Sequence, residues 1–104
     1  MALTELSPVA APNCDAAGNV VWLRGEHDIF TVAALWATMA RAIAFDDGDV
    51  MVDLSAVDFM GASTIGVLVR ARKILRRQSR SLTLRSPSTR ALRVLGLCHL
   101  ANTA

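Results

Sequence analysis

The stretch from Val50 to Gly66 reads V-M-V-D-L-S-A-V-D-F-M-G-A-S-T-I-G. Its first five residues, Val50 to Leu54, are mostly β-branched or apolar and predict a buried central strand. A short polar link and the apolar pair Phe59-Met60 follow, and small residues then open an apolar helix that is predicted from about Ser63 to Gln78. A strand, a tight turn and a helix start predict an α/β fold. The same corner places hydroxyls where backbone N–H groups and the helix dipole favour a phosphate.

Further strands and a second helix are predicted on either side of this stretch. Val20 to Leu23 is a β-branched run typical of a strand, and Ser81 to Arg85 alternates as another. Thr31 is the expected N-cap of a helix from about Val32 to Phe45, whose apolar residues recur at intervals of three and four. The first 17 residues are expected to form a weak edge strand or a loose lead-in. The pattern predicts one central mixed sheet with helices covering both of its faces.

The composition predicts a single small domain. The chain has 104 residues, of which 53% are hydrophobic. It contains no apolar run of the roughly 18 residues that a membrane helix needs and no secretory signal, so a cytoplasmic protein is expected. Cys14 and Cys98 are either two reduced thiols or a redox pair that joins the two ends of the domain. His27 and His99 lack the spacing of metal ligands, so no metal is predicted.

The charges are segregated along the chain. Residues 1–58 carry all nine carboxylates, whereas residues 59–104 carry nine of the eleven cationic side chains. Four of these cations recur at intervals of three and four and predict one charged helix face: Arg70, Lys73, Arg77 and Arg80. Such a face either stays solvated and balances the acidic half of the fold, or it docks an acidic partner.

The sequence gives little support for catalysis or nucleic-acid binding. Between Gly61 and Gly66 the second glycine comes one residue too late for a nucleophile elbow, and the serine lacks an evident base. All five aromatic residues precede Arg70, the first cation of the basic half of the chain, and there is no Walker-type lysine loop. We therefore expect a non-enzymatic protein without a cofactor, which binds neither nucleic acid nor a membrane.

Three blocks of the sequence resemble the STAS domain, the fold of bacterial anti-sigma factor antagonists and of the cytoplasmic part of sulphate transporters. The family reads roughly D-L-x-x-V-x-F-M-D-S-[ST]-G-L-G, and residues 53–66 align with it without a gap. The block Gly25-Glu26-His27-Asp28 resembles the family's G-E-L-D, and Ser86-Pro87-Ser88 resembles the S-P-x that opens a late helix. The resemblance of this last block continues through Leu92, Gly96 and Leu97, and the chain stops soon after, with His99 to Ala104. The final helix of the family is therefore expected to be absent.

The resemblance implies which residues form a partner-binding corner. In the phosphorylated antagonists the serine directly after the aspartate accepts phosphate from the partner kinase, and Ala62 occupies that position here. Ser63 and Thr64 become the candidate phosphoacceptors, although a serine at this place can equally be a helix cap or a ligand contact. The residues implied to contact the partner are Glu26, His27, Asp28, Met60, Gly61, Ala62, Ser63, Thr64 and Ile65.

The function that the resemblance implies is regulatory. We expect an anti-sigma factor antagonist that binds an anti-sigma factor of the histidine-kinase-like ATPase fold and so releases a sigma factor. The alternative is a STAS module that senses a small ligand or a nucleotide within a larger signalling complex. The sequence leaves the oligomeric state open.

Overall fold

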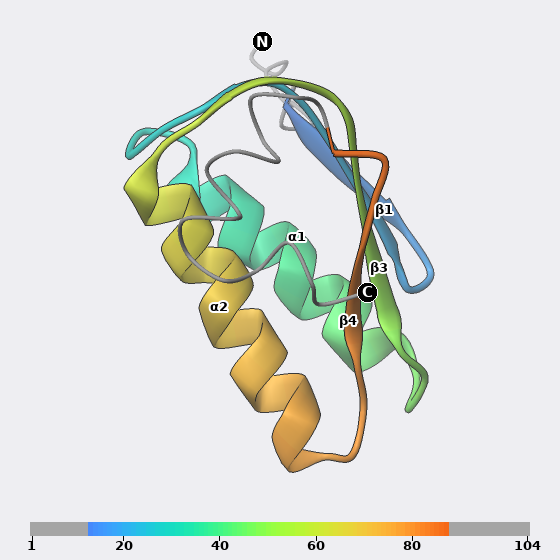
Figure 1. Ribbon diagram of the computed structural model, residues 1–104. Coiled ribbons are helices and arrows are strands. Elements are labelled where there is room, and N and C mark those ends of the chain that lie inside the picture. The colour runs from blue at the N-terminus through green and yellow to red at the C-terminus, as the bar shows by residue number, and fades with distance from the viewer. Residues whose placement is uncertain (1–12, 88–104) are drawn as a thin grey trace, which may run out of the picture.

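The computed structural model describes residues 13–87, which form a layer of helices packed on a layer of strands (Figure 1). The element order is β1 (Cys14–Ala17), β2 (Val20–His27), α1 (Val32–Phe45), β3 (Val50–Met60), α2 (Ala62–Arg77) and β4 (Leu82–Arg85). The expected small α/β domain with one mixed sheet is confirmed. The helix predicted from Val32 to Phe45 has the predicted bounds, and α2 lies within one residue of its prediction at each end.

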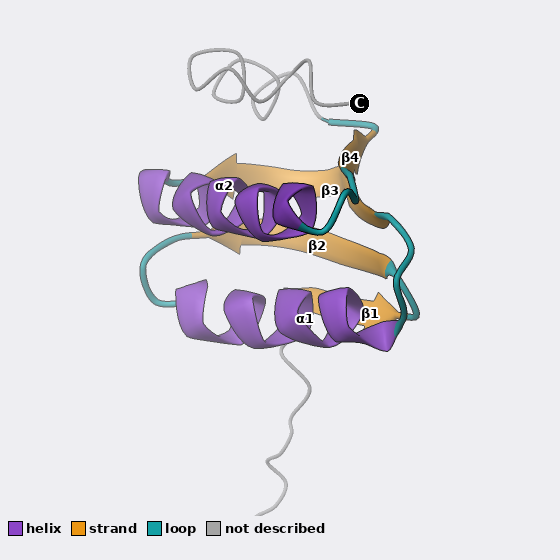
Figure 2. Cartoon of the chain, turned by 90° about the horizontal axis from the view of Figure 1, so that it is seen from below, coloured by secondary structure: helices purple, strands orange, loops and turns teal. Residues whose placement is uncertain are grey.

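The strands lie in the order β1-β2-β3-β4, with β1 antiparallel to β2 and the other neighbours parallel. The two parallel crossovers step in the same direction across the sheet, and crossovers of one hand then place both helices on one face. Figure 2 shows α1 and α2 together on that face. The expectation that helices cover both faces is therefore wrong for the described elements.

The hydrophobic core lies between the two helices and the face of the sheet that they cover. Val50, Val52 and Leu54 of β3 are fully buried, whereas Met51 and Asp53 on the opposite face are partly exposed. This alternation is typical of a sheet that is covered on one side. The helices contribute a fully buried set from one stripe each: Leu35, Met39 and Ala42 of α1, and Leu68, Ala71 and Leu75 of α2.

The parallel pair β2–β3 is longer than the sequence indicates. β3 continues from Leu54 through the predicted polar link to Met60, and β2 continues to His27. Two register shifts interrupt the ladder between them, and Gly25 in β2 adopts a left-handed φ of 71°. Such irregularities break the alternation of apolar and polar residues without ending the strands, which explains why both strands were predicted too short.

The end of α2 determines where Arg80 goes. Ser79 adopts a left-handed φ of 58°, and its N–H donates to the carbonyl oxygen of Arg76 over 3.0 Å. The N–H of Arg80 donates to the carbonyl oxygen of Leu75 over 2.9 Å. These two bonds form a Schellman motif, which ends the helix after Arg77 and reverses the chain.

Arg80 is buried and is not part of the charged helix face to which it was assigned. Its guanidinium donates to the carbonyl oxygens of Ile43, Asp46 and Gly48, each over 2.8 Å. These carbonyls lie at the C-terminal end of α1, whose last turn contains no basic residue. Arg80 therefore supplies both the missing donors and the missing positive charge at that helix end.

Four sequence predictions fall on residues outside the described range. They concern the late helix after Pro87, the absence of the family's last helix, Cys98 and His99. The other member of the predicted redox pair, Cys14, is buried, and its Sγ lies 3.3 Å from Oγ1 of Thr38. Neither described helix is long and apolar enough to cross a bilayer, and residues 13–87 place no three potential metal ligands together.

Candidate functional site

The carboxyl ends of β2 and β3 lie side by side at one end of the sheet, and both helices begin there (Figure 1). His27 is paired with Met60, and the N–H of Gly61 donates to the carbonyl oxygen of His27 over 2.8 Å. The structure thus brings together the two predicted segments, 26–28 and 60–65. Ligands and partners of open α/β sheets commonly bind at the carboxyl ends of the parallel strands.

Gly61 is the N-cap of α2, so Ser63 is the second residue of the helix and not its cap. The carbonyl oxygen of Gly61 accepts the N–H groups of Thr64 and Ile65 over 3.1 and 3.2 Å. Gly61 has no side chain that could cap the first N–H groups, and the first turn contains no acidic residue. The helix therefore begins with backbone donors that its own sequence does not satisfy.

The two candidate phosphoacceptors differ in accessibility. Thr64 is fully buried, and its Oγ1 has no hydrogen-bond partner among the described residues. Because a kinase must reach the hydroxyl, this burial removes Thr64 as an acceptor. Ser63 is partly exposed, and the neighbouring Ala62 is exposed. The helical period gives the same distinction, since Thr64 shares its stripe with the buried residues Leu68 and Leu75.

The other residues predicted to contact a partner divide by exposure in the same way. Four of the nine are buried and support the corner from below: His27, Met60, Thr64 and Ile65. The remaining five are exposed or partly exposed: Glu26, Asp28, Gly61, Ala62 and Ser63. A partner that docks at this corner therefore meets the start of α2 and the turn after β2.

The turn from Asp28 to Thr31 is held by its own polar groups. Oγ1 of Thr31 accepts the N–H of Asp28 and lies 3.1 Å from the Asp28 carbonyl oxygen, to which it donates. The N–H of Phe30 donates to the carboxylate of Asp28 over 2.9 Å. Thr31 is the N-cap residue of α1, as predicted. Its hydroxyl, however, bonds to this turn and not to the N–H groups of the first helical turn.

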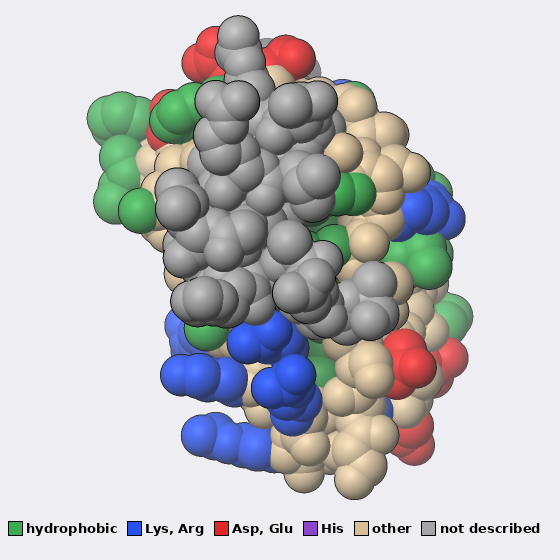
Figure 3. All heavy atoms as spheres, in the orientation of Figure 1, with side chains coloured by type: hydrophobic (Ala, Val, Ile, Leu, Met, Phe, Trp, Pro, Cys, Tyr) green, Lys and Arg blue, Asp and Glu red, His purple; other side chains and the backbone are tan. Residues whose placement is uncertain are grey.

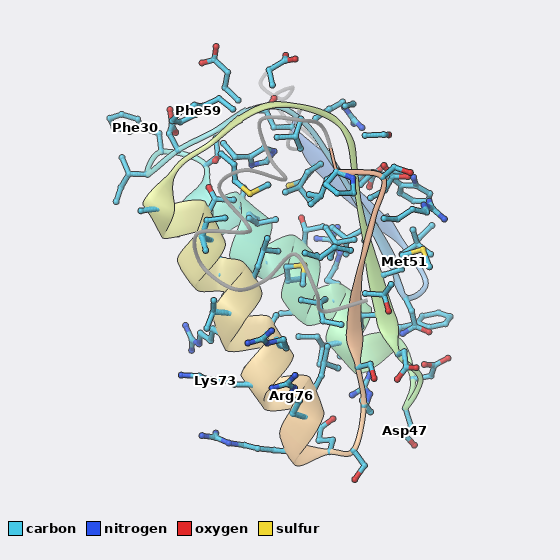
Figure 4. The ribbon with its side chains drawn as sticks, viewed as in Figure 1. Phe30, Asp47, Met51, Phe59, Lys73 and Arg76 are labelled. Carbon is cyan, nitrogen blue, oxygen red and sulfur yellow. The ribbon has the colours of Figure 1, made fainter. Side chains whose placement is uncertain are left out.

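An exposed apolar patch surrounds the corner, and the sequence analysis did not assign it to the site. Ile29, Phe30 and Phe59 are exposed by 69%, 90% and 52%. Figure 3 shows hydrophobic side chains gathered at the upper left, and Figure 4 places Phe30 and Phe59 at this same end of the molecule. Large apolar side chains clustered on a surface mark interaction sites. We call these three residues the apolar patch.

The comparisons with known proteins agree with this architecture. Residues 11–102 match the family described as "Mlab, STAS domain". The chain belongs to this family. Its structure is similar to that of the anti-sigma factor antagonist SpoIIAA in its unphosphorylated form, with a TM-score of 0.69 and 22% identity over 86% of this chain and 82% of SpoIIAA. A candidate anti-sigma factor antagonist from Thermotoga maritima gives 0.68 and 22% over 84% and 77%. A comparison with curated protein sequences finds no match.

At the carboxyl end of β2, this STAS domain buries a neutral histidine. The His27 ring is fully buried, and its Nε2 lies 2.9 Å from the carbonyl oxygen of Asn13. A carbonyl only accepts, so Nε2 carries the proton, while Nδ1 lies 3.4 Å from Oγ1 of Thr31. Burial lowers the pKa of His27 below its ordinary value of 6.5, and the bond to Asn13 opposes this shift more weakly.

We expect the free energy of unfolding to fall as the pH drops below about 6.5. In that range the unfolded chain binds a proton at His27 and the folded domain does not, so stability rises with pH by at most about 1.4 kcal/mol per pH unit. Urea denaturation between about pH 8 and about pH 5 measures this slope. His27→Gln should flatten it, because the glutamine side chain does not titrate in this range. An identical slope in the wild type and in His27→Gln would contradict the assignment.

Proposed function

We propose that this STAS domain is an anti-sigma factor antagonist, which docks its corner onto an anti-sigma factor and thereby releases a sigma factor. The observation that carries the proposal is the apolar patch, which borders the exposed start of α2. The structural likeness to SpoIIAA supports the fold on which such a function is built. We propose further that the protein is cytoplasmic, acts without a cofactor and performs no catalysis of its own.

The patch has the physical character of a binding hot spot. Burying apolar surface contributes about 25 cal/mol per Å², and large side chains near the centre of an interface contribute most of its energy. Phe30 is held in a turn that the Asp28 and Thr31 hydrogen bonds already fix, so docking orders little additional backbone. The unsatisfied N–H groups at the start of α2 offer hydrogen bonds to the same partner.

The proposed partner is an anti-sigma factor of the histidine-kinase-like ATPase fold. Mixing the purified chain with such a factor and its bound sigma factor from the same organism tests the proposal by gel filtration. We expect the chain to co-elute with the anti-sigma factor and the sigma factor to elute free. An intact anti-sigma–sigma complex beside free chain would contradict it. A nucleotide bound by the chain alone would then favour the sensing module.

If the partner is a kinase, phosphate should be transferred to Ser63 and not to Thr64, because only Ser63 is accessible. A phosphate adds about −1.5 to −2 charge at the corner and should weaken docking. Intact-mass measurement and peptide mapping after incubation with the partner and ATP locate it. Phosphate outside residues 61–64 would remove this corner from the switch.

Matched variants separate this role from a structural one. Ser63→Ala should change the free energy of unfolding by less than about 0.5 kcal/mol, because Gly61 and not Ser63 is the cap. Ser63→Asp should weaken partner binding and Ser63→Ala should not. Ala62→Ser places a hydroxyl at the exposed first residue of α2, where the family has its acceptor, and should create a second site of phosphate transfer.

A further inference from the structure

The helices of this domain are cationic and carry no carboxylate. Neither α1 nor α2 contains an aspartate or glutamate, and no carboxylate follows Asp58 anywhere in the chain. Five cationic residues of the two helices are exposed: Arg41, Arg70, Lys73, Arg76 and Arg77. Within residues 13–87 the ion pair that forms is Arg85 with Asp53, on the uncovered face of the sheet. Among residues 13–87, no carboxylate pairs with any of these five exposed helix cations.

Three of the cations in α2 have side chains without a partner in the described part of the domain. The side chains of Lys73, Arg76 and Arg77 make no hydrogen bond or ion pair with any residue from 13 to 87. The side chain of Arg70 does have a partner. Its guanidinium lies 4.4 Å from the ring centroid of Trp36 in α1, a cation–π contact. This contact fixes one charge at the upper end of the cluster. We call Arg70, Lys73, Arg76 and Arg77 the basic cluster.

The basic cluster and the start of α2 lie on one face of the helix. The helical period places Ala62 and Gly66 on the same side as Arg70, Lys73 and Arg77, and all five are exposed. Among residues 13–87, a Cβ on Gly66 would meet nothing within 4 Å, so no described element covers this face of α2. Figure 3 shows the hydrophobic and the cationic side chains along the same edge of the molecule, and Figure 4 shows Lys73 projecting from the outer side of α2.

We infer that the basic cluster is a second contact for the same protein partner, and that it binds a carboxylate-rich segment of that partner. The inference rests on the proposed function, because the apolar patch continues into this face of α2. Along the axis of α2, the cluster from Arg70 to Arg77 lies about 12 to 22 Å from Ala62. The partner should therefore present an apolar site for Phe30 and Phe59, and a group of Asp or Glu side chains about that far from it.

The charges of the cluster are available to a partner, because within residues 13–87 no carboxylate pairs with them. Exposed charges act over about 10 Å at 0.1 M salt, and complementary potentials mainly raise the rate of association. The buried cation of this region, Arg80, is already bonded to carbonyl groups and takes no part. The Trp36 ring beside the cluster is already stacked with Arg70, so that face of the ring is not free to stack on a base.

A titration of the full chain with a poly-glutamate peptide of about 20 residues tests the cluster independently of any partner. In ¹⁵N-correlated NMR spectra the peptide should shift the amides of residues 70–77. The triple variant of Arg70, Lys73 and Arg77 to Gln should bind it about tenfold more weakly with an unchanged fold. Arg77→Gln should weaken binding more than the matched single change Arg41→Gln. Shifts spread evenly over the surface would overturn the inference.

Two further probes decide between classes of acidic surface. Vesicles containing phosphatidylglycerol and a short DNA duplex should bind more weakly than the peptide, and stronger binding by either would overturn a protein partner. With an anti-sigma factor that binds the wild type, the triple variant should associate more slowly and with a smaller salt dependence. Equal rates and salt slopes would overturn the inference and leave the proposed function intact. Failure of the wild type to bind any such factor would instead reject the proposed function.

Discussion

Phe30→Ser should weaken binding to the anti-sigma factor by about 30-fold or more while leaving the domain folded. Phe30 is 90% exposed, so its removal takes almost nothing from the core, and surface substitutions usually change stability by less than about 0.5 kcal/mol. Truncating a large side chain at the centre of an interface costs about 2–4 kcal/mol of binding energy. Isothermal titration calorimetry gives the affinity, and urea denaturation gives the stability of the same sample.

Phe45→Ser is the matched control for this prediction. Phe45 is also exposed, by 63%, but it is the last residue of α1, at the opposite end of that helix from the Asp28–Thr31 turn. The same substitution there should leave the affinity unchanged. Phe59→Ser should behave like Phe30→Ser, since Phe59 belongs to the patch. Equal losses at Phe30 and Phe45 would mean that general surface hydrophobicity, and not this corner, drives association.

Arg80→Met should destabilise the domain by about 2–4 kcal/mol, the largest stability effect expected of any cationic residue here. Its guanidinium satisfies three carbonyl oxygens at and beyond the end of α1, and its loss leaves them without donors. Arg80→Lys keeps the charge but cannot reach all three acceptors, so it should recover part of the loss. Urea denaturation at neutral pH measures both variants.

Arg77→Met is the control for Arg80. Arg77 is exposed and lies in the last turn of α2, so its removal should change the free energy of unfolding by less than about 0.5 kcal/mol. For affinity the order should be reversed. Arg77→Met should weaken binding to the partner, whereas Arg80→Met should lower binding only by reducing the fraction of folded protein. If Arg80→Met were as stable as wild type, the carbonyl contacts would not hold α1 as described.

The contrast between Arg77 and Arg80 shows what sequence periodicity could not reveal. The two residues are three apart and fit one helical face, yet the helix ends at Arg77. The Schellman motif that ends it has Ser79 in the left-handed conformation. Glycine is the usual residue at this position, so the sequence lacks the common signal for a helix end. The bounds of α1 were predictable because its apolar residues alternate regularly with exposed ones. The length of β3 was not, because its register shifts break the pattern.

The candidate site was predictable in part for the same reasons. The motif from Asp53 to Gly66 indicated a strand followed by a helix and gave the helix start to within one residue, but it suggested a polar link where β3 continues to Met60. It did not distinguish Ser63 from Thr64, although the helical stripe through Leu68 does. The residues that carry the proposed function, Phe30 and Phe59, are aromatic, and an aromatic side chain in a sequence is more often taken for core than for surface. Only the geometry of the Asp28–Thr31 turn shows that Phe30 points outward.

Hydroxyl-radical footprinting of the complex with the anti-sigma factor tests the docking corner most directly. In the free domain Phe30 and Phe59 are exposed at the corner, whereas Trp22 on β2 is exposed by 36% and Met51 on β3 is partly exposed. Figure 4 shows Met51 away from the corner. The account predicts that the partner protects Phe30 and Phe59 from oxidation and leaves the reactivity of Trp22 and Met51 unchanged. Protection of Trp22 and Met51, with Phe30 and Phe59 as reactive as in the free domain, would contradict it.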